Sequence, residues 1–309
     1  MTQTQGYAAH AGQHMEVELA SQPDMWERAT GLTTEQALLP GPGERVAVVG
    51  CGTSWFMAQS YAVLRESAGL GVTDAYAASE AFPATGMFAD RGYDAVVALT
   101  RSGTTTEVLE LLSALRGRTR TIGLVADLNT PLVDLVDDVV PLSFADERSV
   151  VQTRFATTAL AFFRASLGED LTSVIAAGRE AVTAELAEAL VTAAQYTFLG
   201  SGWTVGLAHE AALKMREAAQ SWTESYPAKE YRHGPIAIAA SGRVTWVLGT
   251  APDGLSDDIA ATGAHYEKRP VDAMADLVRV QRVALERARR AGLDPDQPRN
   301  LTRSVILQS

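Results

Sequence analysis

The chain has 309 residues, of which 47% are hydrophobic and 20% are charged, as is usual for a soluble globular protein. Its formal net charge of −11 excludes a general nucleic-acid surface, which needs a stripe of basic residues. A small anion is still an acceptable ligand, because backbone N–H groups and hydroxyls hold phosphate without net positive charge. A chain of this length is expected to form two domains, each with its own core.

The cysteine content and the lack of targeting or membrane-spanning segments indicate the cellular compartment. Cys51 is the single cysteine, so no internal disulfide is possible and a reducing cytoplasm fits best. Residues 1–10 have neither the basic nor the apolar region of a signal peptide, and no apolar run reaches the roughly 18 residues of a membrane span. We therefore expect a cytoplasmic protein that binds neither membranes nor nucleic acid and carries no metal or other cofactor.

The first third of the chain predicts the start of an α/β fold. Residues 1–40 are expected to form an N-terminal helical segment, with Pro23 separating two short helices. Residues 45–49 are a run of mostly β-branched side chains, typical of a parallel strand buried on both faces. The turn Gly50-Cys-Gly-Thr-Ser54 follows, and residues 55–69 have helical spacing.

A second unit of the same kind comes next, and residues 41–185 are predicted to form the first domain. Residues 95–99 read as a strand, residues 100–106 as a hydroxyl-rich turn and residues 107–115 as a helix. Alternating strands and helices indicate a parallel, doubly wound sheet. Further along, we expect two strands at 121–125 and 138–142 and a helix at 150–166.

Residues 186–309 repeat this pattern in shorter form and are predicted to be a second, reduced domain. A strand at 196–199 leads into Gly200-Ser-Gly202 and a helix, and residues 243–248 form the next strand. Residues 250–272 leave room for one polar helix and one weak strand before a last helix at 274–291. Two halves that each open with strand, Gly-x-Gly and helix indicate an internal duplication.

A stripe of charged residues follows the second glycine turn. Glu210, Lys214 and Glu217 stand at i, i+4 and i+7 and so lie on one helix face, and His233 follows in a His-Gly-Pro turn. Carboxylates and histidines near a lysine are suited to proton transfer. The alternative is that Glu217 is an exposed carboxylate paired with Lys214 or Arg216, and that His233 is structural.

The two turns of the first domain carry many hydroxyls. Gly50-Cys-Gly-Thr-Ser54 is not a dinucleotide-binding G-x-G-x-x-G motif, since Trp55 stands where the third glycine belongs. It does place Thr53 and Ser54 at a helix N-terminus, where unpaired N–H groups favour an anion. Simple N-capping is the alternative. Both turns are expected at the carboxyl edge of one sheet. The second turn contributes Thr100, Ser102, Thr104 and Thr105.

Five motifs occur in one order along the chain: Cys51-Gly-Thr-Ser54, Thr100-Arg-Ser-Gly-Thr-Thr105, Glu210 to Glu217, Glu230 to Pro235 and Asp296-Gln-Pro-Arg-Asn-Leu301. On these motifs the chain resembles the sugar isomerase (SIS) domain family, and within it the isomerase half of glucosamine-6-phosphate synthase. The resemblance implies an α/β fold of two tandem flavodoxin-like units, three-layer α/β/α with parallel sheets, the second shortened.

The same resemblance implies roles for single residues in binding a hexose 6-phosphate. The backbone of Val150 and Val151 would lie over the substrate, Thr53 near the sugar ring, and Arg303 would also contact it. Arg101 stands where the synthase has glutamine. The residues implied to hold the phosphate are Ser54, Thr100, Arg101, Ser102 and Thr105.

For catalysis, the resemblance implies that Glu217 moves a proton between C1 and C2, with Lys214 and Glu210 in support. It implies that His233 opens the sugar ring of the neighbouring subunit's substrate, and hence a homodimer. Arg303 departs from the family, because the synthase has a lysine there that forms an imine with the ketose. A guanidinium stays protonated and cannot form that imine.

We therefore expect a phosphosugar enzyme that does not carry out glutamine-dependent synthesis, since a glutamine-hydrolysing domain is also absent from the sequence. The expected substrate is glucosamine 6-phosphate or N-acetylglucosamine 6-phosphate, from which proton abstraction at C2 leads to isomerisation, deamination or dehydration. Two alternatives remain at this point: a non-catalytic sugar-phosphate sensor and a fructosamine-phosphate deglycase.

Overall fold

The computed structural model describes residues 11–82 and 84–307 and divides into two compact units. Of the described residues, the five-stranded unit comprises those in 24–146, 154–171 and 302–307, and the four-stranded unit those in 11–23, 147–153 and 172–301. The N-terminal ten residues, on which the expectation of a missing signal peptide rests, lie outside the described residues. The domain boundaries expected from the sequence at residues 40 and 185 stay predictions.

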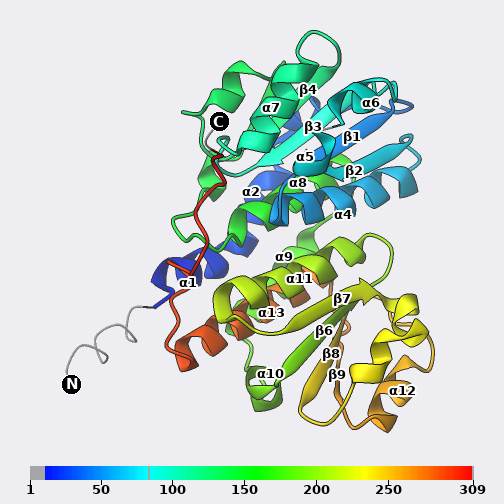
Figure 1. The fold of residues 1–309 in the computed structure, drawn as a ribbon, viewed down its shortest axis with the longest axis vertical. Coiled ribbons are helices and arrows are strands. Elements are labelled where there is room, and N and C mark those ends of the chain that lie inside the picture. The colour runs from blue at the N-terminus through cyan, green and yellow to red at the C-terminus, as the bar shows by residue number, and fades with distance from the viewer. Residues whose placement is uncertain (1–10, 83, 308–309) are drawn as a thin grey trace, which may run out of the picture. The chain divides into compact units, whose positions relative to one another are not determined.

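The five-stranded unit is built on an all-parallel sheet in the order β2-β1-β3-β4-β5, the flavodoxin-like order (Figure 1). Buried side chains fill both faces of β1 and β3, as continuous apolar strands require. The strands are β1 Val46–Gly50, β2 Thr73–Ala77, β3 Ala95–Thr100, β4 Arg120–Val125 and β5 Asp138–Pro141.

Helices cover both faces of this sheet. On one face, alternate residues of β1 and β3 pack with α5 and α7 in a single apolar cluster. In the layer of α4 and α8, Tyr61 stacks on Phe163 with ring centroids 3.9 Å apart. The helical elements are α2 Gln22–Thr30, α3 Thr33–Gln36, α4 Thr53–Ser67, α5 Ala78–Ala81, α6 Thr85–Ala89, α7 Thr106–Leu115 and α8 Arg154–Ser166, with short 3-10 turns η1 Pro131–Asp134 and η2 Ser143–Ala145.

The four-stranded unit repeats the strand order without a fifth strand: β7-β6-β8-β9, again all parallel. The predicted duplication with a shortened second copy is therefore confirmed. The elements are α1 Gln13–Ala20, α9 Thr172–Thr183, α10 Glu188–Thr192, β6 Gln195–Gly200, α11 Thr204–Ala219, β7 Thr223–Pro227, η3 Ala228–His233, η4 Pro235–Ile238, β8 Arg243–Leu248, α12 Leu255–Ala261, β9 His265–Glu267 and α13 Ala273–Arg290.

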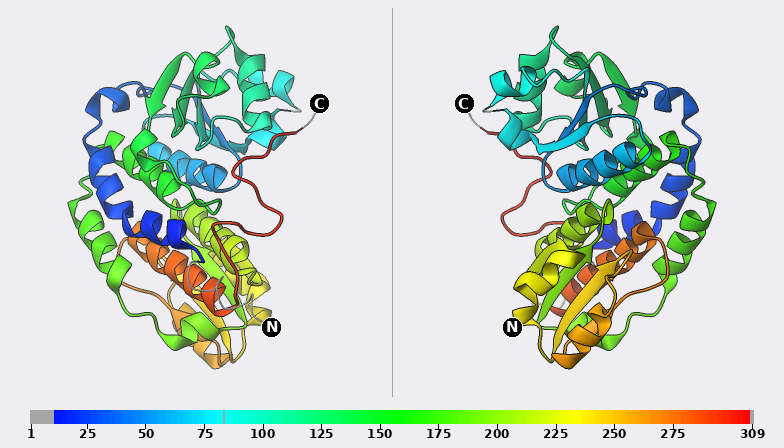
Figure 2. Two further views of the ribbon diagram at one scale, coloured as in Figure 1. Left: turned by 90° about the vertical axis from the view of Figure 1, so that its left-hand side faces the viewer. Right: turned by 90° about the vertical axis from the view of Figure 1, so that its right-hand side faces the viewer.

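The first helix of the chain is fixed against the last one. Figure 2 shows α1 beside α13, and Arg289 on α13 forms an ion pair of 2.8 Å with Glu16 on α1. Asp296, part of the motif in the C-terminal segment, accepts hydrogen bonds from the N–H groups of His14 and Met15 at the start of α1. Asp296 thus caps a helix. A bilayer-crossing helix is missing from the described residues, since none combines the needed length with sufficient hydropathy.

Candidate active site

The first hydroxyl turn joins β1 to α4 through two glycines. A Cβ atom on Gly50 would lie 2.8 Å from the Cβ of Ser54, so the helix approaches the strand end as closely as only glycine allows. Gly52 has φ +54°, and α4 then begins at Thr53. Thr53 and Ser54 stand in the first turn of the helix and add hydroxyl groups there, while the N–H of Ser54 donates to the Cys51 carbonyl at 3.1 Å. The turn therefore presents donors suited to a phosphate.

The second hydroxyl turn joins β3 to α7 and is rigid. Gly103 has φ +64°, and a Cβ atom on it would lie 2.1 Å from Oγ1 of Thr130. The hydroxyl oxygen of Thr100 accepts from the N–H of Gly103 at 3.3 Å, and that of Ser102 accepts from the N–H of Thr104 at 3.2 Å. Thr105 precedes the first residue of α7.

The sheet brings the two turns to one edge. β1 and β3 are parallel neighbours, with Val49 paired to Ala98, so their carboxyl ends and the turns that follow lie side by side. Most of the predicted phosphate ligands are nearly buried, with exposed fractions of 4–6%, which restricts them to ligands that enter the turn. These are Ser54, Thr100, Arg101 and Ser102, while Thr105 is half-buried; Thr53, predicted near the sugar ring, is 5% exposed.

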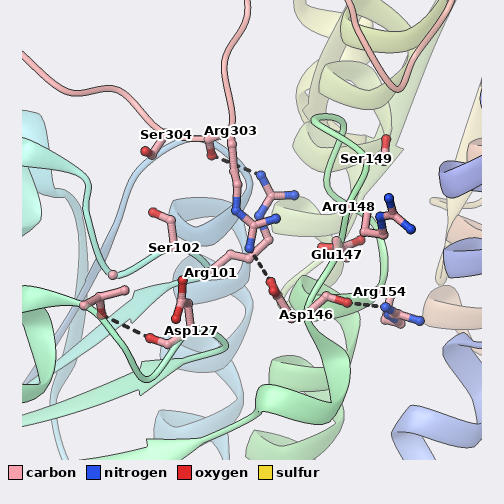
Figure 3. A network of polar contacts seen from close by, with 12 residues as sticks. Arg101, Ser102, Asp127, Asp146, Glu147, Arg148, Ser149, Arg154, Arg303 and Ser304 are labelled. Carbon is pink, nitrogen blue, oxygen red and sulfur yellow. Dashed lines mark hydrogen bonds and ion pairs between the residues drawn. The ribbon is translucent and has the colours of Figure 1, made fainter.

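Arg303 lies at the second turn, where Figure 3 shows it between Arg101 and Asp146. The Arg101 guanidinium donates to the carbonyl oxygen of Arg303 at 3.0 Å, and the Arg303 guanidinium pairs with the Asp146 carboxylate. The next residue, Ser304, is hydrogen-bonded to the hydroxyl of Thr104 at 2.9 Å. The C-terminal segment is thus bonded to the second hydroxyl turn, with the Arg303 side chain held by a carboxylate.

The charged stripe on α11 forms a buried cluster in the four-stranded unit. The Lys214 ammonium donates to the Glu217 carboxylate and lies 3.6 Å from an oxygen of Glu210. The side chains of Lys214 and Glu210 are 0% exposed, whereas that of Glu217 is 20% exposed. Of these three groups, only Glu217 therefore presents oxygen atoms to a ligand from solvent.

Lys214 carries a stable positive charge despite its burial. Desolvation by itself lowers the pKa of this ammonium, but the charges of Glu210 and Glu217, with a contribution from Glu147, outweigh it and raise the pKa above its ordinary value. The cluster therefore holds a fixed positive charge next to the carboxylate of Glu217 at its rim.

Residues 147–153 form a closed loop in the same unit, which corrects the predicted helix at 150–166. The Glu147 carboxylate accepts from the N–H and the hydroxyl of Thr153, at 2.6 and 3.0 Å, so the helix begins only at Arg154. Glu18, buried on α1, accepts from backbone N–H groups at the start of the loop. This loop presents Val150, half-buried, and Val151, 1% exposed.

His233 ends η3 on the surface of the four-stranded unit. Its neighbour Arg232 fixes the turn by donating to Asp258 at 2.5 Å and to the Asp253 carbonyl at 2.8 Å. No hydrogen bond or ion pair between described residues joins His233 to the cluster on α11. His233 is therefore not bonded to Glu217 within the described chain. Its role in the active site of a neighbouring subunit stays a prediction.

The sequence reasoning missed several residues beside Glu217. A cavity of about 540 Å3 is lined by Glu217, Arg216 and Gln220 from the end of α11 and by Arg299 and Asn300 from the C-terminal segment. The signal was partly visible, because Arg299 and Asn300 belong to a motif quoted for the resemblance. Their proximity to Glu217 depends on tertiary structure. Among the described residues, no group of three acidic, histidine or cysteine side chains is arranged to hold a metal ion.

No protein-family model matches the chain. The glutamine–fructose-6-phosphate aminotransferase (isomerizing) of Gloeobacter violaceus is 26% identical over 324 aligned residues, which cover 86% of this chain and 52% of that protein. The chain therefore spans about half the length of the curated relatives it matches.

Two solved structures share the fold over nearly their whole length. Glucosamine-6-phosphate deaminase from Thermotoga maritima aligns with a TM-score of 0.77 at 23% identity, covering 94% of this chain and 99% of that one. The C-terminal domain of an aminotransferase from Francisella tularensis, named for glucosamine and fructose 6-phosphate, aligns with a TM-score of 0.75 at 20% identity, covering 92% and 98%. The predicted resemblance to the sugar isomerase (SIS) domain family is confirmed, and so is the predicted fold.

Proposed function

We propose that this protein is an enzyme that removes the C2 proton of an amino-sugar 6-phosphate, either glucosamine 6-phosphate or its N-acetyl form. The observation that carries the proposal is the cluster on α11, in which a fully buried ammonium anchors one partly exposed carboxylate. Glu217 is the base in this proposal, and Lys214 and Glu210 position it. Once the sugar ring is open, the C1 carbonyl makes the C2 proton acidic enough for a carboxylate to take it.

Ring opening is assigned to His233, and the proposed active form is a homodimer in which His233 completes the neighbour's site. Its exposure and the absence of a bond between it and the α11 cluster, among the described residues, support a role outside its own subunit's cluster. The backbone of Val150 and Val151 would lie over the sugar, on a loop held by Glu147 and Glu18.

The phosphate is assigned to the two hydroxyl turns, which offer hydroxyls, helix N-termini and one guanidinium. A phosphate dianion suits such donors, and their burial excludes bulky ligands. The names of the relatives support the substrate class, because the aminotransferases act on fructose 6-phosphate and the deaminase on glucosamine 6-phosphate. The phosphate is assigned to Ser54, Thr100, Arg101, Ser102 and Thr105, and Thr53 is assigned to the sugar ring.

The further course of the reaction is limited by Arg303. Its guanidinium forms no imine and is paired with Asp146, so amino transfer through a Schiff base is excluded from the proposal. After C2 deprotonation, the enediol-like intermediate is reprotonated at C1 in an isomerisation. With a free amine this gives an imine at C2, which water hydrolyses to a ketose and ammonia. With an N-acetyl group the nitrogen is a poor leaving group, and hydroxide departs from C3 instead, which gives net loss of water.

The test is incubation of the protein with each sugar phosphate in deuterated water. We expect deuterium at C2, or ammonia, a ketose or an unsaturated sugar, to appear in NMR spectra. Glu217→Gln should slow every such signal at least about 100-fold, the usual contribution of a general base. Glu188→Gln, a carboxylate with 67% side-chain exposure outside the cluster, serves as the matched control.

Full turnover by Glu217→Gln would refute the assigned base. Thermal stabilisation by a sugar phosphate without deuterium exchange or product, in the wild-type protein, would favour the sensor over the enzyme.

A further inference from the structure

The cavity beside Glu217 lies within the four-stranded unit and has two walls. One is the last turn of α11, with Arg216, Glu217 and Gln220, and the other is the C-terminal segment with Arg299 and Asn300. At about 540 Å3 the cavity has room for more than an acetyl group. The proposed function leaves it unused, although it adjoins the atom that would take the proton.

The charges on these walls favour an anion. Among the residues that line the cavity, Arg216 and Arg299 contribute two positive charges and Glu217 contributes one negative charge, so the lining is positive on balance. Such a positive wall stands out in a chain with a formal net charge of −11. At the end of α11, the N–H groups of Gln220 and Ser221 donate to the carbonyl groups of Arg216 and Met215, at 3.0 and 3.1 Å.

Two residues at the cavity have a left-handed backbone. Gln220 has φ +52°, as the C-cap of α11, and Asn300 has φ +63°, and they are the two non-glycine residues with positive φ in the described part of the chain. Both line this one cavity. The Arg299 guanidinium donates to the side-chain oxygen of Gln220 and so joins the two walls. The side chains at the cavity are therefore held in place from both walls.

We propose that this cavity is a subsite for a carboxylate, bound by the guanidinium groups of Arg216 and Arg299 next to Glu217. The carboxylate is carried either on a substituent of the substrate's nitrogen or by a separate small molecule. In the first case the inference deepens the proposed function and rests on it, because the nitrogen is attached to the carbon from which Glu217 takes the proton.

Both guanidinium groups have donors left for such a ligand. Arg216 directs Nη1 at the hydroxyl of Thr223, at 3.1 Å, and Arg299 directs Nη2 at Gln220. A guanidinium has several N–H groups in a planar fork that matches the two oxygens of a carboxylate. The amide side chains of Gln220 and Asn300 add polar groups at the cavity wall.

The experiment has two arms, both on the full-length protein. In the first, isothermal calorimetry measures binding of malonate and of its neutral analogue malonamide. In the second, it compares N-acetyl with N-malonyl glucosamine 6-phosphate, which differ by one carboxylate, in the Glu217→Gln background to prevent turnover. Each arm is repeated with Arg216→Gln and Arg299→Gln, and with Arg269→Gln as the control, whose side chain is 54% exposed and pairs with Glu267.

We expect malonate to bind and malonamide not to, with affinity at least tenfold weaker in Arg216→Gln and Arg299→Gln and unchanged in Arg269→Gln. At least tenfold preference for the N-malonyl sugar, lost in the same two variants, identifies the substrate's substituent as the source. Malonate binding without that preference identifies a separate carboxylate. If neither arm shows an arginine-dependent gain from the carboxylate, the subsite is refuted, whereas missing deuterium exchange at C2 in the wild-type protein refutes only the proposed reaction.

Discussion

Ser54 and Thr204 occupy the same position in two copies of one turn, but their hydroxyl groups have different partners. Each follows a Gly-x-Gly turn, and the second glycine has φ +54° in one copy and +58° in the other. The Thr204 hydroxyl donates to the Leu248 carbonyl and accepts from the N–H of Ser201, both at 2.8 Å. Within the described residues, no side-chain hydrogen bond is recorded for Ser54. The duplicated turn is thus capped internally in one unit and has a hydroxyl available for a ligand in the other.

This difference predicts opposite effects of the two alanine substitutions. Ser54→Ala should weaken binding of glucosamine 6-phosphate about tenfold, roughly the value of one lost hydrogen bond to a charged group, with little change in unfolding. Thr204→Ala should lower the free energy of unfolding by about 1–2 kcal/mol, because buried groups lose their partner. Calorimetric binding and urea unfolding of both variants measure this. The assignment of the first turn to phosphate fails if the two variants behave alike.

Much of the fold was accessible from the sequence because its central strands are apolar throughout. The predicted strands at 45–49, 95–99 and 243–248 match β1, β3 and β8 to within one residue at either end. β2 and β7 were missed, since Thr73–Ala77 and Thr223–Pro227 are edge strands that are mostly half-buried and contain polar residues. The periodicity and composition of such a segment do not distinguish it from a loop. It adopts a strand conformation because it pairs with a central strand.

The candidate site was predictable only as far as helical spacing and local motifs reach. Spacing alone places Glu210, Lys214 and Glu217 on one face of α11, and the structure has them in one cluster. Burial decides which of the three meets solvent, and burial depends on packing. The contribution of Glu147 to the raised pKa of Lys214 could not be predicted. Glu147 lies 67 residues earlier in the chain, and only tertiary structure brings its loop to the cluster.

The second hydroxyl turn should tolerate no side chain at Gly103. Gly103→Ala adds a Cβ atom 2.1 Å from Thr130 Oγ1 at a φ of +64°, so steric overlap adds to backbone strain. Gly117→Ala is the control, because φ is +71° there and nothing lies within 4 Å. In the control, the left-handed conformation alone should lower the free energy of unfolding by about 1–2 kcal/mol. Gly103→Ala should lower the free energy of unfolding, measured in urea, clearly more than the control does, and it should also weaken sugar-phosphate binding. Equal losses of stability in the two variants would contradict the close packing of this turn.

Removing the charge of Lys214 should destabilise the protein through its neighbours. Lys214→Met leaves the buried Glu210 without its ammonium partner, and breaking such a pair typically costs about 3–5 kcal/mol. The double variant Lys214→Met with Glu210→Gln should recover part of this loss, because the buried negative charge is removed together with the ammonium. Urea unfolding of the two single variants and the double variant measures the coupling. Additive losses would mean that the two residues do not compensate each other.

The raised pKa of Lys214 also predicts how stability depends on pH. Because the ammonium binds its proton more tightly in the folded state, its stabilising effect is complete below the ordinary lysine pKa of about 10.4 and is lost as pH rises through the higher folded pKa. In that alkaline range the free energy of unfolding of the wild type should fall by about 1.4 kcal/mol per pH unit more than that of the double variant, which lacks this group. Lys268→Gln, at an exposed position, should follow the wild type. Parallel curves for the wild type and the double variant would mean that burial and the neighbouring carboxylates leave the Lys214 proton as it is in the unfolded chain.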